Sequence, residues 1–146
     1  NWPTLVVHGD FHAANVRWRG GEITGIFDFE YADLNYRLYD VATAIASLAF
    51  NWDGAEAGRL QIELAQAFLD GYRCGPGRAG PLPILLEEEL AALPRYLDLA
   101  HLLTLEWTLM PGTRRRLGTA SADRYARHAR MALSWLGRND ASAISQ

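Results

Sequence analysis

Short apolar runs near the start of the chain have the pattern of β-strands. Residues 4–7 are β-branched and apolar, which predicts a short buried strand. Residues 15–18 and 23–27 are strand-like and flank an Arg-Gly-Gly-Glu segment at 19–22, which predicts a β-hairpin with glycines in its turn. The pattern loosens over residues 31–37, where we expect a loop.

From Leu38 onward the apolar residues recur at the spacing of a helix that buries one face. In the alanine-rich segment that follows, these positions are Val41, Ala42, Ile45, Leu48 and Ala49. They predict a mostly buried helix. A second helix is predicted over residues 55–73, and its apolar face is assigned to Leu60, Leu64, Ala67 and Phe68.

Glycine and proline divide the remainder of the chain. Residues 74–83 are rich in both and are predicted to form a loop. Residues 84–110 have helical spacing, and Pro94 is expected to break or kink this segment because proline suits the first turn of a new helix. A last helix is predicted before the polar residues 139–146, which are expected to fray.

The predicted fold is therefore α+β and mainly α, with a small β-hairpin element followed by about four or five helices. Strands do not alternate with helices, so we expect no doubly wound parallel sheet. With 146 residues the chain has the length of one domain. A chain of this length can bury a core without disulfides or a structural metal.

Charge and cysteine content narrow the class of protein. The 14 basic residues, all of them arginine, and 17 acidic residues give a net charge of −3, which argues against a nucleic-acid binder. The single cysteine, Cys74, excludes an internal disulfide framework, and we expect a cytoplasmic protein. The longest apolar run, 41–50, is too short to span a bilayer, so no membrane segment is expected.

Oxygen-bearing side chains gather around the predicted hairpin. Asp10 and Asn15 lie five positions apart between two strands, and Asp28 follows the hairpin 18 positions after Asp10. Because a hairpin brings its two ends together, these side chains are expected to converge, and oxygen ligands suit Mg²⁺. Phosphoryl transfer also needs a separate carboxylate that orients the attacking hydroxyl. We therefore assign Asp10 as the catalytic base and Asn15 and Asp28 as the Mg²⁺ ligands.

These segments carry a family resemblance. His8-Gly9-Asp10-x4-Asn15, followed by Ile26-x-Asp28, resembles the catalytic and metal-binding segments of the aminoglycoside phosphotransferase/choline kinase family. Tyr39-Asp40-Val41-Ala42 is similar to the family's Tyr-Asp-Leu-Ala, and the stretch that begins at Asp28 also resembles the homoserine kinase branch. The resemblance implies ATP as phosphoryl donor and a small-molecule alcohol as acceptor. His8 and Asp40 would then support the catalytic loop.

The resemblance also implies a protein-kinase-like fold with two lobes, of which this chain holds the C-terminal one. That lobe would span residues 1–138, with the catalytic loop and hairpin in 1–33 and the helical part in 38–138. An N-terminal lobe, in cis or in trans, would bring a glycine-rich phosphate cover and a lysine. This chain has no lysine and does not begin with Met, so we expect it to be part of a longer protein. The alternative is a non-catalytic or degenerate kinase-like module that binds or regulates.

Four further residues are candidates for binding the acceptor. Glu30 and Asp33 would attract a cationic acceptor, or else they are solvated loop charges. Tyr31 would pack against an ammonium group of the acceptor, or else it packs in the protein core. His12, next to the catalytic loop, is assigned to the lining of the site. The acceptor's identity, the nucleotide preference and the oligomeric state stay open.

Overall fold

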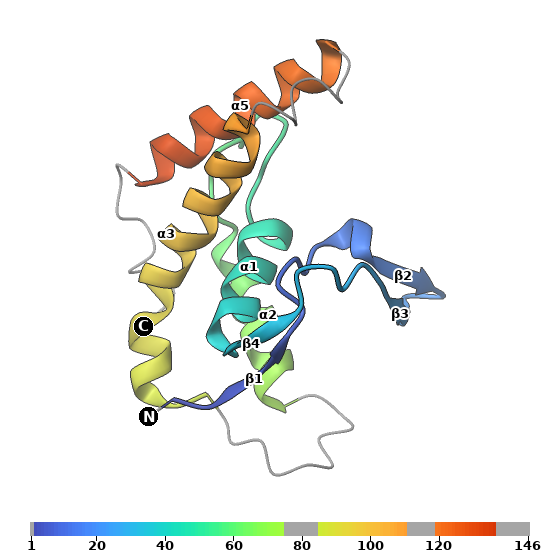
Figure 1. The fold of residues 1–146 in the computed structure, drawn as a ribbon, viewed down its shortest axis with the longest axis vertical. Helices are drawn as coiled ribbons and strands as arrows, with labels where there is room; N and C mark the ends of the chain where they lie inside the picture. Colours follow the sequence, from blue (N-terminus) through green and yellow to red (C-terminus); the bar gives the residue numbers. More distant parts are fainter. Residues whose placement is uncertain (1, 75–84, 111–118, 137–146) are drawn as a thin grey trace.

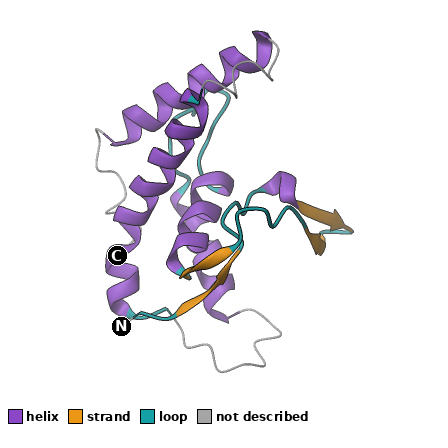
Figure 2. Cartoon of the chain, in the orientation of Figure 1, coloured by secondary structure: helices purple, strands orange, loops and turns teal. Residues whose placement is uncertain are grey.

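A computed structural model describes residues 2–74, 85–110 and 119–136 (Figure 1). In these segments a block of short strands precedes a block of helices, so the fold is α+β and mainly helical, as predicted (Figure 2). The predicted loop at 74–83, after its first residue, and the predicted frayed tail at 139–146 lie outside the described residues. None of the helices in the described segments is long and apolar enough to cross a membrane.

The strands form two separate antiparallel pairs. β2 (Val16–Arg19) and β3 (Glu22–Ile26) make the predicted hairpin, with Val16 opposite Ile26. Gly20 and Gly21 form its turn with φ angles of 60° and 86°, which favour glycine and match the twist of the two strands. β1 (Thr4–Val7) pairs with β4 (Asp33–Tyr36). In Figure 1 the hairpin projects to one side of the helices, and β1 and β4 lie between the two.

Two expectations for this region are wrong. β4 occupies part of the stretch 31–37 for which a loop was predicted. Its Asp and Asn residues disfavour a strand, and the strand forms because the edge of β1 supplies hydrogen-bonding partners. The first strand is also less buried than predicted: Val7 is buried, whereas Val6 and its cross-strand partner Leu34 are 77% and 67% exposed.

The helices pack around α1 (Leu38–Leu48), whose predicted buried face is confirmed. α3 (Glu87–Leu109) contacts both α1 and α5 (Thr119–Leu136), and α5 crosses the upper end of α3 in Figure 1. α2 (Ile62–Cys74) packs against α1. Within the described residues, buried side chains from α1, α2, α3 and α5 form one apolar core, which includes Val41, Ile45, Leu69, Leu93, Leu97 and Trp135.

Two helix boundaries differ from the prediction. α2 begins at Ile62 rather than at residue 55, because the preceding segment turns back and Leu60 forms a β-bridge with Phe50. α3 is one helix that continues through Pro94, so the prediction of a new helix there is wrong. Proline removes one backbone hydrogen bond. The helix continues because Leu93 and Leu97 on either side are fully buried, at 0% exposed.

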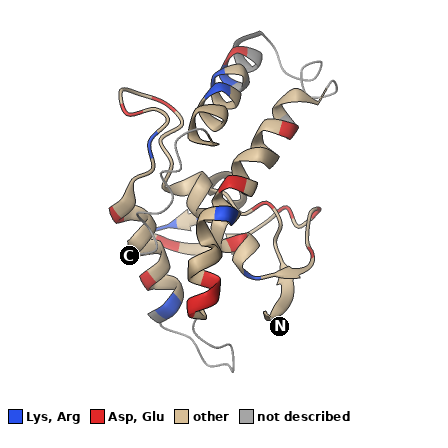
Figure 3. Cartoon of the chain, turned by 90° about the vertical axis from the view of Figure 1, so that its left-hand side faces the viewer, with Lys and Arg blue, Asp and Glu red and all other residues tan. Residues whose placement is uncertain are grey.

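A buried ion pair links the strands to the helices. Arg37 Nε and Nη2 donate to Glu89 Oε1 and Oε2 at 2.9 and 2.6 Å, and both side chains are buried. Burial is the largest single effect and raises the pKa of Glu89. The hydrogen bonds from Arg37 and from the backbone N–H of Leu86, together with the charge of Arg37, outweigh burial and leave that pKa lowered. Glu89 lies in the first turn of α3 with Glu87 and Glu88, and negative charge there suits the helix dipole. Figure 3 shows acidic residues of the chain in red, including those at the start of this helix. The pair therefore anchors the start of α1 against the start of α3.

Candidate functional site

The predicted site residues lie where the β1–β4 pair meets the β2–β3 hairpin. Asp10 lies in the loop after β1, and Asn15 ends the short 3-10 helix η1 (Ala13–Asn15) that precedes β2. Asp28 follows β3 by two residues. The backbone N–H of Phe27 donates to the carbonyl of Asn15 at 2.9 Å, so the hairpin continues pairing up to this point. The structure thus brings Asn15 and the segment that carries Asp28 together at the open end of the hairpin.

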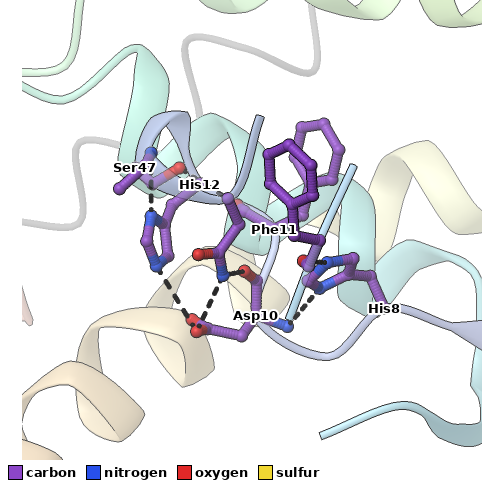
Figure 4. Close-up of polar contacts among 8 residues, drawn as sticks. His8, Asp10, Phe11, His12 and Ser47 are labelled. Atoms are coloured by element: carbon purple, nitrogen blue, oxygen red, sulfur yellow. Dashed lines mark hydrogen bonds and ion pairs between the residues drawn. The ribbon is translucent and has the colours of Figure 1, made fainter. Parts of the chain in front are cut away.

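Asn15 is oriented by Asp10. Its buried side-chain amide donates from Nδ2 to the backbone oxygen of Asp10 at 2.9 Å and to Asp10 Oδ2 at 3.2 Å (Figure 4). Because both contacts use Nδ2, the side-chain oxygen of Asn15 is turned away from Asp10. An amide oxygen held in this way is a ready ligand for a hard cation.

Asp40 in the first turn of α1 binds the backbone of the loop. Its carboxylate accepts from the N–H of His8 at 2.6 Å and from the N–H of Gly9 at 2.9 Å, one to each oxygen. Hydrogen bonds to a charged carboxylate are stronger than neutral ones. Because α1 is the most buried helix of the core, its position fixes the loop that carries Asp10.

His8 connects the loop to the hairpin. Its Nδ1 accepts from the backbone N–H of Asp10 at 3.2 Å, which assigns the ring proton to Nε2. Nε2 then donates to the carbonyl of Phe27 at 2.7 Å, one residue before Asp28. The buried ring also packs against Phe29, with 4.6 Å between ring centres. Both ring nitrogens of His8 are therefore used for structure.

Backbone geometry constrains two positions beside the site. Asp28 has a φ of 63°, a left-handed conformation that costs a non-glycine residue roughly 1–2 kcal/mol. Gly9 has a φ of 82°, and a Cβ atom there would lie 2.2 Å from the carbonyl oxygen of Tyr31. The chain therefore accepts strain at Asp28 and requires glycine at position 9, which indicates that the placement of the Asp28 side chain matters.

The oxygen donors fit a hard cation better than zinc. Asp28 is exposed, and no hydrogen bond or ion pair to its carboxylate occurs within the described residues. With the side-chain oxygen of Asn15, it offers the oxygen ligands that Mg²⁺ prefers. No cluster of three or more His, Cys, Asp or Glu side chains that could hold a metal occurs in the described part of the chain.

The candidate acceptor residues form an exposed segment after Asp28. Glu30 and Tyr31 are exposed, so Tyr31 does not pack in the core. The carboxylate of Asp33 accepts from the backbone N–H of Leu34 at 2.7 Å and begins β4. His12 lies apart from them, beside Asp10, with its Nε2 3.4 Å from Asp10 Oδ2.

One contact that holds the loop carrying Asp10 was not predicted from the sequence. Ser47 in α1 donates from Oγ to the carbonyl of Phe11 at 3.2 Å, which gives the loop a second anchor on the same helix as Asp40 (Figure 4). A serine within an apolar helical run is itself a signal, because a buried hydroxyl needs a partner. The hydroxyl also bonds to the carbonyl of Ala44 in its own helix, so the sequence alone does not distinguish the two.

Comparison with known proteins identifies related sequences. The model of the phosphotransferase enzyme family matches residues 1–82. The chain is 32% identical to a homoserine kinase of Bradyrhizobium sp. (strain ORS 278), over 75% of this chain and 33% of that protein. It is 34% identical to a homoserine kinase of Rhizobium etli, over 63% of this chain and 25% of that protein. A homoserine kinase of Methylobacillus glycogenes is 35% identical, over 65% of this chain and 26% of that protein. The chain thus spans a third or less of the length of these relatives.

Proposed function

This chain belongs to the phosphotransferase enzyme family, as its motifs indicated, and we propose that it is the catalytic C-terminal lobe of a small-molecule kinase. The lobe spans residues 1–138, with the catalytic loop and hairpin in 1–33 and the helical part in 38–138. An N-terminal lobe, in cis or in trans, completes the nucleotide site. The observation that carries the proposal is the Asp10 carboxylate, held by Asn15 in a loop whose backbone is bonded to Asp40.

Asp10 acts as the base in this proposal. The hydroxyl oxygen of the acceptor attacks the γ-phosphorus of ATP, and the bond from that phosphorus to the β–γ bridging oxygen breaks. The Asp10 carboxylate takes the hydroxyl proton, and ADP leaves with the bridging oxygen. Asp10 suits this role because its side chain is 43% exposed and an acceptor can reach it, while Asn15 restrains its orientation.

Asn15 and Asp28 would hold Mg²⁺. The amide oxygen of Asn15 and the carboxylate of Asp28 are oxygen donors on the two sides of the hairpin end. Bound there, Mg²⁺ would offset the negative charge of the nucleotide phosphates. His8 and Asp40 support this arrangement, because one fixes the carbonyl before Asp28 and the other fixes the loop before Asp10.

The acceptor in this proposal is a hydroxy amino acid of the homoserine type. The three relatives above are homoserine kinases. The exposed carboxylates of Glu30 and Asp33, with Tyr31 between them in the sequence, are suited to bind an ammonium group. We propose the cytoplasm as the location of this enzyme. That location is consistent with ATP and homoserine as substrates and with the expectation that neither a membrane nor a nucleic acid is a partner.

Replacement of Asp10 in the protein at its full natural length tests this function. Asp10→Asn keeps the size of the side chain and removes the base, so turnover with ATP and homoserine should fall at least about a hundredfold. Mg²⁺-dependent ATP binding, measured by calorimetry, should be retained. Asp70→Asn, the same change at an exposed position of α2, is the matched control and should leave turnover unchanged.

Two results decide against the proposal. Near-normal turnover of the Asp10→Asn variant would remove Asp10 from the role of base. Failure of the wild-type protein to phosphorylate homoserine, choline or an aminoglycoside, with Mg²⁺ and ATP present, would favour the alternative of a kinase-like module without catalysis.

A further inference from the structure

The contacts of His12 define which tautomer its neutral ring adopts. His12 is the N-cap of η1, and its Nδ1 accepts from the backbone N–H of Ala14 at 3.2 Å. Because that contact occupies the lone pair of Nδ1, the proton of the neutral ring is on Nε2. Nε2 lies 3.4 Å from Asp10 Oδ2 (Figure 4). The nitrogen that bears the proton is therefore the one that faces the carboxylate.

The two carboxylate oxygens of Asp10 have different surroundings. Oδ2 is approached by two donors, Asn15 Nδ2 at 3.2 Å and His12 Nε2 at 3.4 Å. No donor to Oδ1 is found within the described residues. Oδ2 accepts a hydrogen bond from Asn15 and has the N–H group of His12 beside it, so it is the less accessible of the two oxygens for a substrate. Oδ1 is thus the oxygen left for an incoming hydroxyl.

We propose that His12 is a positioning residue that, together with Asn15, holds the carboxylate of Asp10 so that Oδ1 receives the proton of the acceptor hydroxyl. This inference rests on the proposed function, because it assigns the reactive oxygen of the proposed base. It is an alternative to the prediction that His12 lines the site and contacts the acceptor, and the kinetics below distinguish the two. The contact of His12 at 3.4 Å is long for a hydrogen bond, and such contacts shorten when substrate closes the site.

Two variants separate the contact with Asp10 from the capping of η1. Asparagine is among the best N-cap residues, so His12→Asn keeps an acceptor for the N–H of Ala14. Its side chain is too short to reach Asp10 Oδ2. Glutamine has a longer side chain whose amide can donate to the carboxylate, so His12→Gln restores that contact.

Steady-state kinetics of the protein at its full natural length provide the test. His12→Asn should lower kcat about ten- to a hundredfold and leave the KM for the alcohol unchanged, because a displaced base affects the transition state and not binding. His12→Gln should recover a large part of kcat. Asp70→Asn again serves as the control. A raised KM with unchanged kcat would show that His12 binds the acceptor, and full activity of His12→Asn would show that it only caps η1. Either result overturns the inference.

A double variant distinguishes a failure of this inference from a failure of the proposed function. If His12 acts through Asp10, adding His12→Asn to Asp10→Asn should cause no further loss of kcat. A further tenfold loss in the double variant would overturn the positioning role. If Asp10→Asn alone keeps its turnover, the proposed function fails. If Asp10→Asn is inactive and His12→Asn is fully active, only the inference about His12 fails.

Discussion

Replacement of Asp40 by asparagine should release the loop that carries Asp10. Each oxygen of the carboxylate accepts one backbone N–H, from His8 at 2.6 Å and from Gly9 at 2.9 Å. Asparagine keeps one acceptor and places an NH₂ group where the second oxygen was. One backbone N–H then faces another donor, and the remaining hydrogen bond no longer involves a charge.

The size of the effect follows from these two bonds. A hydrogen bond to a charged group contributes about 1.5–3 kcal/mol, and an unsatisfied buried N–H costs about 1–3 kcal/mol. Because solvent reaches part of this site, we expect a net loss near the lower end, about 2 kcal/mol. A loop displaced by this change also misplaces Asp10, which lowers turnover by about a hundredfold.

Thermal unfolding and turnover of the full natural-length protein measure the two effects. Asp40→Asn should lower both the Tm and kcat. Asp70→Asn, an exposed aspartate of α2, should lower neither. An Asp40→Asn protein with the wild-type Tm and wild-type kcat would show that the two backbone hydrogen bonds contribute neither to stability nor to the placement of Asp10.

Three further substitutions test the catalytic loop, the buried ion pair and the helical core. Gly9→Ala should abolish turnover because a Cβ atom would lie 2.2 Å from a backbone oxygen. Gly20→Ala is the matched control, because Gly20 also has a positive φ but a Cβ atom there would meet no atom within 4 Å, so this variant should keep most of its turnover; equal turnover in the two variants would contradict this. Arg37→Met leaves Glu89 charged and buried, so denaturant unfolding should show a loss of about 3–5 kcal/mol, much of it regained when Glu89→Leu is added. Burial lowers the pKa of His101 to about 4 from 6.5. The unfolded chain therefore binds the proton first, and stability should fall by about 3 kcal/mol as the pH falls from 6.5 to 4. His101→Phe should flatten that part of the stability profile, and an unchanged profile would contradict the assignment.

The sequence predicted those elements whose conformation is set by residues close to one another in the chain. The hairpin was predicted because Gly20 and Gly21 supply the positive φ angles of its turn. The strand at 33–36 was not, because its sequence favours a loop and only pairing with β1 makes it a strand. Such pairing is a tertiary interaction that leaves no local pattern.

The buried face of α2 shows a second limit. Leu64 was placed on the apolar face but is 45% exposed, whereas Ala65 and Leu69 are buried at 0% and 5%. The run from Ile62 to Leu69 contains two overlapping stripes with helical spacing. Only packing against α1 decides which stripe is buried.

The candidate site likewise has features that the sequence predicts and features that it does not. The spacing of Asp10, Asn15 and Asp28 selected them from the sequence, because a hairpin necessarily brings its two ends together. The orientation of the Asn15 amide and the proton on His12 Nε2 depend on individual hydrogen bonds. These details have no sequence pattern, and the proposed role of Oδ1 of Asp10 depends on them.

The proposed kinase activity is tested most directly by ³¹P NMR of the full natural-length protein with ATP, Mg²⁺ and homoserine. We expect a phosphate monoester of the alcohol to appear together with an equal amount of ADP. We also expect the signal of the monoester to be lost in the Asp10→Asn variant. Formation of ADP and inorganic phosphate without a phosphate monoester, or no conversion of ATP with any alcohol tested, would show that the protein is not a small-molecule kinase with Asp10 as its base.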